Sequence, residues 1–80
     1  MLVPLYGFLR GDTIGLVILA HDTDTIRDVG AKLQEAASVR VAPVPVVEVR
    51  HRGRLLDPDR TVAESGLEAL ERVDVCPKGT

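Results

Sequence analysis

The sequence predicts an α+β domain in which one amphipathic helix packs on one face of a small mixed β-sheet. Three observations predict this class: a capped amphipathic segment follows Thr25, strand-like segments lie on both sides of it, and turn residues separate these segments. A single amphipathic helix needs a sheet to cover its apolar stripe. Since 80 residues suffice for only one hydrophobic core, we expect residues 1–80 to form a single domain.

Two extended segments open the chain. Residues 2–10 and 13–20 are rich in β-forming side chains, and Gly11-Asp12 separates them, which predicts a β-hairpin. The alternating side chains are apolar at both parities. The sequence therefore leaves open which set faces the helix.

The next segment carries a helix start. The Thr25 side chain can accept a backbone N–H bond while Asp28 reaches back, a carboxylate form of the capping box, so the helix should begin at Ile26. Apolar residues then recur at spacings of three and four, which predicts one buried stripe made of Ile26, Val29, Leu33, Ala36 and Ala37.

A connector and a second hairpin should follow the helix. Prolines at two positions interrupt residues 38–45, which favours a connector over a central strand. Residues 46–52 are strand-like, Gly53 turns the chain, and residues 54–56 can form a short strand. The sheet should thus continue with one longer strand and one short strand.

A second capping box precedes the last strand. Thr61 and Glu64 have the spacing that opens a single helical turn, and Gly66 supplies its left-handed end. Residues 72–77 then close the sheet. The predicted order is strand, strand, helix, strand, short strand, helical turn and strand.

This order is that of the ubiquitin-like β-grasp fold, and the local sequence resembles that of ubiquitin. The resemblance lies in the capped helix and in the turn-rich return to the last strand: Asp24-Thr25-Ile26, Ala31-Lys32-Leu33-Gln34, and Gly53-Arg54 through Leu56-Asp57 to Arg60-Thr61. It implies a ββαββ fold whose mixed sheet packs on one helix, with a short helical turn before the last strand.

A closer resemblance spans nearly the whole chain. It rests on short motifs, namely Pro4, Gly11-Asp12, Asp22-Thr23, Val39-Arg40-Val41-x-Pro43-x-Pro45, Val49-Arg50-His51-Arg52, Pro58, Thr61-Val62-Ala63, Gly66-Leu67, Glu71 and Val73-Asp74-Val75. In these the chain resembles the small B subunit of bacterial toluene monooxygenases. The resemblance implies a non-catalytic accessory subunit of a diiron aromatic or alkene monooxygenase, docked on the large hydroxylase subunit that holds the metals.

The alternative function is a free-standing ubiquitin-like interaction module that serves as an adaptor. A conjugated modifier needs a tail that ends in paired glycines, whereas this sequence ends in Gly79 followed by Thr80. We therefore do not expect covalent attachment to other proteins.

The first hairpin gives a physical reason to expect a partner. If one parity faces the helix, the other projects outward as an apolar patch that is typical of an interface: Tyr6, Phe8, Val17 and Leu19. Tyrosine and phenylalanine are favoured interface anchors. Two alternatives remain, in which the connector at residues 38–45 covers these side chains or the patch forms a homodimer.

The basic cluster in the second hairpin contains Arg50, His51, Arg52 and Arg54. We expect Arg50 and Arg52 to form a rim that pairs with carboxylates of the partner and steers association. The alternative is a solvated hairpin whose arginines pair within the chain, with Glu48, Asp57 or Asp59.

Composition disfavours several other classes. Ten basic and twelve acidic residues give a net charge of −2, which offers no electrostatic case for nucleic acid or an anionic membrane. The apolar residues 1–9 are too short to span a bilayer, and the single cysteine, Cys76, favours a reducing, cytoplasmic location. We expect no catalytic residue, cofactor or metal site, because neither His21-Asp22-Thr23-Asp24 nor any other set of residues has a suitable spacing.

Overall fold

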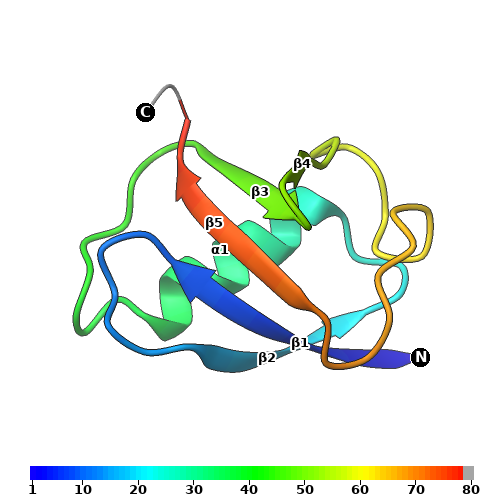
Figure 1. Ribbon diagram of the computed structural model, residues 1–80, viewed down its shortest axis with the longest axis horizontal. Coiled ribbons are helices and arrows are strands. Elements are labelled where there is room, and N and C mark those ends of the chain that lie inside the picture. Colours follow the sequence, from blue (N-terminus) through cyan, green and yellow to red (C-terminus); the bar gives the residue numbers. More distant parts are fainter. Residues whose placement is uncertain (79–80) are drawn as a thin grey trace.

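In the computed structural model, which describes residues 1–78, five strands and one α-helix form two layers (Figure 1). The elements are β1 (Leu2–Leu9), β2 (Leu16–His21), α1 (Ile26–Ala36), β3 (Val47–His51), β4 (Arg54–Leu55) and β5 (Arg72–Pro77). Gly79 and Thr80, on which the expectation about the C-terminal tail rests, lie outside the described residues.

The sheet has the strand order β2-β1-β5-β3-β4. The two central strands, β1 and β5, pair in parallel, and the other neighbours pair antiparallel. Helix α1 crosses behind the sheet in Figure 1, and no helix of residues 1–78 covers the front. The predicted α+β class, with a mixed sheet packed on one helix, is confirmed.

Helix α1 begins at Ile26, as predicted. The backbone N–H of Asp28 donates to Thr25 Oγ1 at 3.2 Å, and the backbone N–H of Thr25 donates to Asp28 Oδ2 at 3.1 Å, which completes the capping box. The prediction for Ala36 is wrong, because this side chain is exposed. It lies about 100° around the helix axis from Ala37, which is buried.

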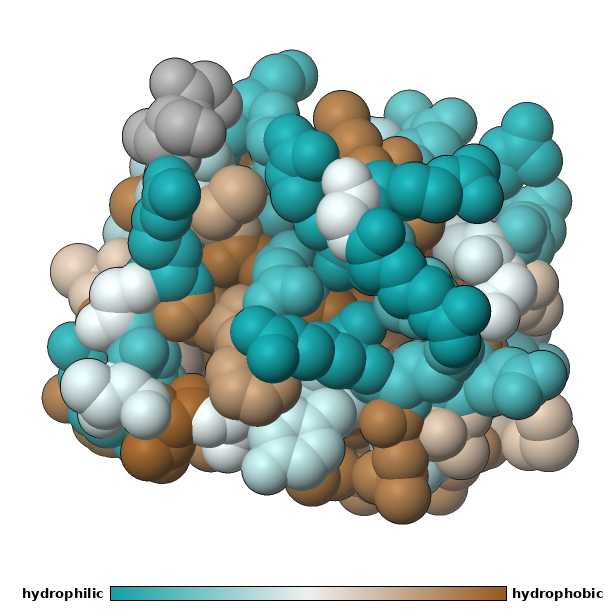
Figure 2. All heavy atoms as spheres, in the orientation of Figure 1, coloured by the Kyte–Doolittle hydropathy of each residue, from teal (hydrophilic) through white to brown (hydrophobic). Residues whose placement is uncertain are grey.

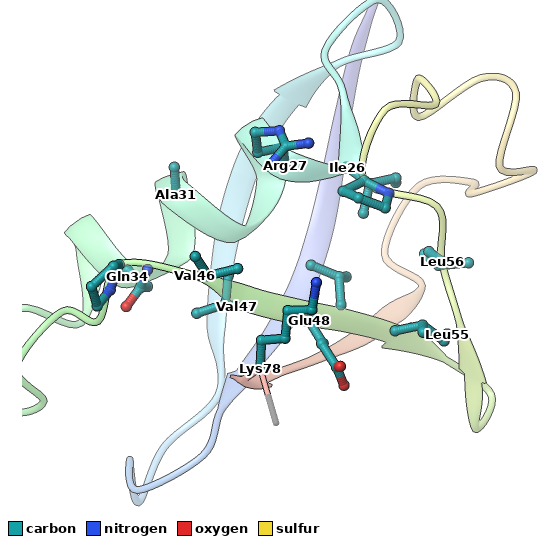
Figure 3. Close-up of a pocket in the computed structure, with 13 residues that line it drawn as sticks. Ile26, Arg27, Ala31, Gln34, Val46, Val47, Glu48, Leu55, Leu56 and Lys78 are labelled. Atoms are coloured by element: carbon teal, nitrogen blue, oxygen red, sulfur yellow. The ribbon is translucent and has the colours of Figure 1, made fainter. Parts of the chain in front are cut away.

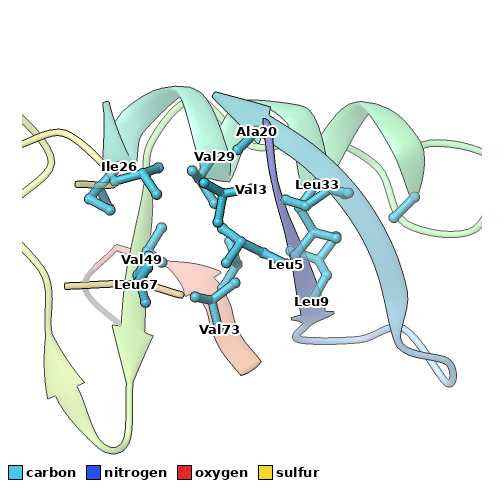
Figure 4. Packing of buried hydrophobic residues seen from close by; sticks show 14 residues of the cluster. Val3, Leu5, Leu9, Ala20, Ile26, Val29, Leu33, Val49, Leu67 and Val73 are labelled. Carbon is cyan, nitrogen blue, oxygen red and sulfur yellow. The ribbon is translucent and has the colours of Figure 1, made fainter. Parts of the chain in front are cut away.

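The hydrophobic core lies between α1 and the inner face of the sheet (Figure 4). Its largest fully buried side chains come from the helix, two strands and one loop: Leu5, Ile26, Val29, Leu33, Val62, Val73 and Val75. Leu67 also enters this core, directly after Gly66 turns the chain at a φ of 74°. The aliphatic stripe of α1 is thus covered by aliphatic side chains of the sheet.

The first hairpin differs from its prediction at the start of β2. This strand begins at Leu16 instead of residue 13, because the preceding loop is held by Asp12. The Asp12 carboxylate accepts the backbone N–H of Thr13 at 2.8 Å and binds the Arg40 guanidinium through two bonds of 2.8 and 2.9 Å. Ile14 therefore lies in the loop with 48% of its surface exposed and does not face the helix.

The second hairpin follows the prediction closely. Strand β3 begins at Val47, one residue after the predicted start, and β4 is limited to Arg54–Leu55. The turn between them places Arg52 at a φ of 54° and Gly53 at a φ of 78°. Two consecutive residues with positive φ are the signature of a two-residue hairpin turn.

The second capping box is also present. The backbone N–H of Thr61 donates to Glu64 Oε1 at 3.0 Å, and that of Glu64 donates to Thr61 Oγ1 at 3.1 Å. One helical turn follows, with the N–H of Ser65 bonded to the Thr61 carbonyl at 3.0 Å. The predicted single turn therefore forms and goes no further. No helix in the described part of the chain is long and apolar enough to cross a membrane.

Candidate protein-docking surface

The face of the sheet opposite α1, called the open face below, displays one parity of each strand. In β1, Leu5 has no exposed surface, whereas its neighbour Tyr6 is 41% exposed. The structure therefore decides the question that the sequence left open: Val3, Leu5 and Leu9 point toward the helix, and Tyr6 and Phe8 point away from it.

The apolar patch consists of Tyr6, Phe8, Val17 and Leu19, the four residues predicted to project outward. Tyr6 stands opposite Val17 in the antiparallel pair, and Leu19 stands opposite Pro4. Val17 and Leu19 are 56% and 59% exposed, and Phe8 is half-buried. Because cross-strand neighbours lie about 5 Å apart, these side chains form one contiguous patch.

The two aromatic rings of the patch are held in place. Tyr6 and Phe8 stack with their centroids 5.2 Å apart at an angle of 10°, and the Arg72 guanidinium carbon lies 4.0 Å from the Phe8 centroid. Gly15 leaves room for this stack, since a Cβ there would lie only 2.4 Å from Tyr6 Cε1. Side chains that are already ordered lose less conformational entropy when a partner binds.

The other half of the open face is charged. Arg72 pairs with Asp74 at 2.9 Å within β5, and Arg50 pairs with Glu48 at 3.4 Å within β3. Asp74 stands between Phe8 of β1 and Arg50 of β3, so these three residues form one row across the sheet. With about 4.8 Å between strands, Arg50 lies about 10 Å from the apolar patch.

Figure 2 views the open face directly. Hydrophilic side chains gather over the strands that Figure 1 labels β5 and β3, and hydrophobic side chains line the edge formed by β1 and β2. The open face therefore combines an apolar half with a charged half.

The basic cluster is partly neutralised by a residue that the sequence did not suggest. Arg52 Nη2 and His51 Nε2 both lie 3.2 Å from Glu71 Oε1. The backbone N–H of Glu68 donates to Glu71 Oε2 at 2.8 Å, and this bond, aided by His51 and Arg52, lowers the pKa of the Glu71 carboxyl. The turn before β5 thus places an acidic group beside the β3–β4 turn.

The alternative partners named from the sequence are only partly correct. Glu48 does pair with Arg50. Asp57 instead pairs with Arg60 at 3.9 Å, and Asp59 with Arg27 at 2.6 Å. The prediction fails for these two because the chain after β4 turns toward the start of α1, where the Ile26 N–H donates to the carbonyl of Arg60 at 2.9 Å.

Two residues of the open face were missed by sequence reasoning. Arg72 orders the Phe8 ring, and Gly15 lies against both rings. The spacing of Arg72 and Asp74 could have indicated an ion pair on one strand face. The contact of Arg72 with Phe8 has no local signal, because it depends on the parallel pairing of β1 with β5.

Comparison with known families and structures gives consistent matches. The family described as toluene-4-monooxygenase system protein B matches residues 2–76. A chain in the structure of the toluene 4-monooxygenase HD complex with the inhibitor 4-bromobenzoate is 28% identical, with a TM-score of 0.90 over 98% of this chain and 100% of that chain. No curated protein sequence matches.

More distant structures share the fold. The ubiquitin of Caldiarchaeum subterraneum is 14% identical, with a TM-score of 0.80 over 100% of this chain and 98% of that chain. A ubiquitin-like domain from Arabidopsis thaliana is 15% identical, with a TM-score of 0.76 over 99% of this chain and 80% of that chain. The predicted ubiquitin-like β-grasp fold is confirmed.

Proposed function

This chain belongs to the family of toluene-4-monooxygenase system protein B, and from this we infer that it is a non-catalytic accessory subunit of a multicomponent diiron aromatic or alkene monooxygenase. Its contribution is docking, and catalysis takes place on the large hydroxylase subunit. The partner is therefore that subunit.

The open face is the proposed contact surface for the hydroxylase. The observation that carries this proposal is the apolar patch, in which Tyr6, Val17 and Leu19 are each at least 41% exposed on a face that no helix of the described residues covers. Contiguous exposed apolar side chains mark interaction sites. The stacked rings of Tyr6 and Phe8 serve as anchors, which a flat apolar surface of the partner would bury.

Arg50 and Arg52 form the proposed rim of the contact. Arg50 lies in the same row as Phe8, and the Arg52 side chain is 79% exposed. Their internal ion pairs lie at the surface, where such pairs contribute little to folding, so both arginines remain available to carboxylates of the hydroxylase. Charges at a rim act mainly on the rate of association and on orientation.

The proposal treats residues 1–80 as one docking domain that works in the cytoplasm. One continuous core supports the first part, because its buried residues come from α1 and the residue after it, from β1, β2, β3 and β5, and from the loop before β5. The unpaired cysteine, Cys76, supports the second part, since free thiols persist in reducing compartments.

Co-expression with the hydroxylase subunits tests the proposed contact. The wild-type chain should co-purify with them in a stoichiometric complex, and Tyr6→Asp should weaken binding at least tenfold, because a carboxylate would be buried against an apolar surface. Calorimetric titration of the purified hydroxylase with each variant measures the change. Circular dichroism should show the same unfolding temperature within a few degrees, because Tyr6 lies outside the core.

Val39→Asp is the matched control, because Val39 is 84% exposed but lies in the connector after α1. It should bind the hydroxylase like the wild type. Equal affinities of the Tyr6→Asp variant and the wild type would rule out the open face as the contact. A chain that forms no complex with the hydroxylase would instead favour the adaptor function.

A further inference from the structure

A second surface lies on the other side of the sheet, where α1 runs beside β3. A groove of about 290 Å³ opens there, between the helix and the outer part of the sheet (Figure 3). Much of its lining is apolar and includes Ile26 and Ala31 of the helix, Val47 of β3, and Leu55 and Leu56 after β3. The groove does not include the apolar patch.

The groove runs along an edge of the sheet that is only partly covered. Strand β4 pairs with β3 at Arg50 and His51. The Leu56 N–H extends this cover by one bond, to the carbonyl of Val49 at 2.9 Å. In the described residues, β3 has no strand partner on this side before Val49.

The register shows which backbone groups face the groove. The Lys78 N–H donates to the Val46 carbonyl at 3.1 Å, so this carbonyl points toward β5. Antiparallel pairs alternate along a ladder, so the N–H and C=O of Val47 point the other way, to the open edge. Val47 therefore offers one donor and one acceptor to a further strand, in the wall of an apolar groove.

Exposed apolar side chains lie beside this edge. Val46 and Leu55 are 51% and 56% exposed, and both line the groove. The helix approaches β3 closely at Gly30, where a Cβ would lie 2.8 Å from Val47 Cγ2. The floor of the groove is thus firmly packed, while its mouth exposes apolar surface.

The charge of the groove is unbalanced. Of its charged lining residues, Arg27 is paired with Asp59 at 2.6 Å, and Glu48 with Arg50 at 3.4 Å. Lys78 forms no ion pair within residues 1–78. One positive charge therefore remains available at this end of the groove, which favours an acidic group on the occupant.

We propose that the groove between α1 and β3 binds an extended apolar segment of a partner protein, which adds as a strand beside Val47 and places an acidic side chain against Lys78. Strand addition uses main-chain bonds for affinity and side-chain pockets for selectivity. This contact does not include the apolar patch. The proposal does not depend on the proposed function.

Nuclear magnetic resonance with synthetic peptides tests the groove. The probe is an acetylated six-residue peptide of alternating valine and serine with one terminal glutamate, made in two forms with the glutamate at either end. Binding should shift the amide signals of Val47, Ala31 and Leu56 and slow hydrogen exchange at the Val47 amide. Whichever of the two peptides binds more tightly shows whether the added strand runs parallel or antiparallel to β3. A peptide that is N-methylated at the residue facing Val47 should lose binding at least tenfold.

Two variants locate the site. Ala31→Arg places a long side chain in the groove from an exposed helix position and should weaken binding at least tenfold, with little effect on helix stability. Lys78→Glu should weaken binding of the glutamate peptide roughly two- to fivefold. It should strengthen binding of a lysine-ended peptide by a similar factor, as expected for one surface ion pair.

Tyr6→Asp, which lies on the open face, should leave peptide binding unchanged and thus separates this test from that of hydroxylase docking. The proposal would be overturned by shifts that map to β2 or to the apolar patch, by equal binding of the N-methylated peptide, or by failure of every peptide to bind.

Discussion

The two faces of the sheet are formed by the same strands but differ in burial. In β1, Leu5 is fully buried under α1, whereas the adjacent Tyr6 is 41% exposed on the open face. Successive side chains of a strand point to opposite faces, and one helix can cover only one of them. One strand therefore contributes both to the core and to the proposed docking surface.

The two faces also differ in the residues they use. The core is built from leucine, isoleucine, valine and alanine alone. The chain has a single tyrosine and a single phenylalanine, and both stand on the open face. Aromatic side chains are thus absent from the buried cluster and present where a partner can reach them. This contrast separates the residues of the core from those of the proposed docking surface.

The largest expected contrast compares one leucine from each face. Leu5→Ala should lower the free energy of unfolding by about 2–5 kcal/mol, because it removes a fully buried side chain. Leu19→Ala should change it by no more than about 0.5 kcal/mol, because Leu19 is 59% exposed. Urea denaturation of both variants measures the difference. Equal losses would show that the open face also stabilises the fold.

A smaller effect is expected from the contact between Arg72 and Phe8. A double-mutant cycle with Arg72→Ala and Phe8→Leu should give a coupling free energy of about 0.5–1 kcal/mol, the range of an exposed cation–π contact. Thermal or urea unfolding provides the four values. Replacing Arg72→Ala by Arg54→Ala in the cycle is the control and should give no coupling, since Arg54 lies in β4. Zero coupling with Arg72 would mean that its guanidinium does not hold the ring.

The smallest effect should come from the ion pair between Asp12, in the loop between β1 and β2, and Arg40, in the connector after α1. The hydrogen bond from Arg40 is the main cause that lowers the pKa of Asp12 below its ordinary value of 3.8. As the pH falls, the Asp12 carboxylate is therefore protonated at a higher pH in the unfolded chain than in the folded chain. The ion pair therefore stabilises the fold fully above the pKa that Asp12 has in the unfolded chain. This contribution is lost as the pH falls through the pKa that Asp12 has in the folded chain.

Asp12→Asn should be less stable than the wild type at neutral pH, and the two unfolding curves should converge as the pH falls below about 4. Urea denaturation across this range checks the expected result. If the difference in stability between the two proteins stays constant with pH, it arises from packing or hydrogen bonding and not from the charge of Asp12.

Elements with local causes were predicted well. The start of α1 follows from the Thr25 and Asp28 capping box, and the turn at residue 53 follows from the glycine that adopts a φ of 78°. Strand β5 has the predicted bounds, residues 72–77. Each of these features depends on groups within a few residues of one another, so the sequence window contains the whole interaction.

Features with distant causes were predicted less well. The start of β2 depends on the Asp12 contact with Arg40, 28 residues away. The Glu71 contact with Arg52 spans 19 residues. Sequence patterns give no direct signal for such pairs, because the chain path between the two groups decides whether they meet.

The candidate surface shows the same division. The sequence alone determined that the first hairpin carries more apolar side chains than one helix can cover, and it supplied the family resemblance that indicated a partner. The tertiary structure alone decided which parity turns outward, that Arg72 holds Phe8, and that an edge of β3 opens beside α1. The physical reason is that alternation within a strand is local, whereas strand pairing and helix placement join residues that are far apart in the chain.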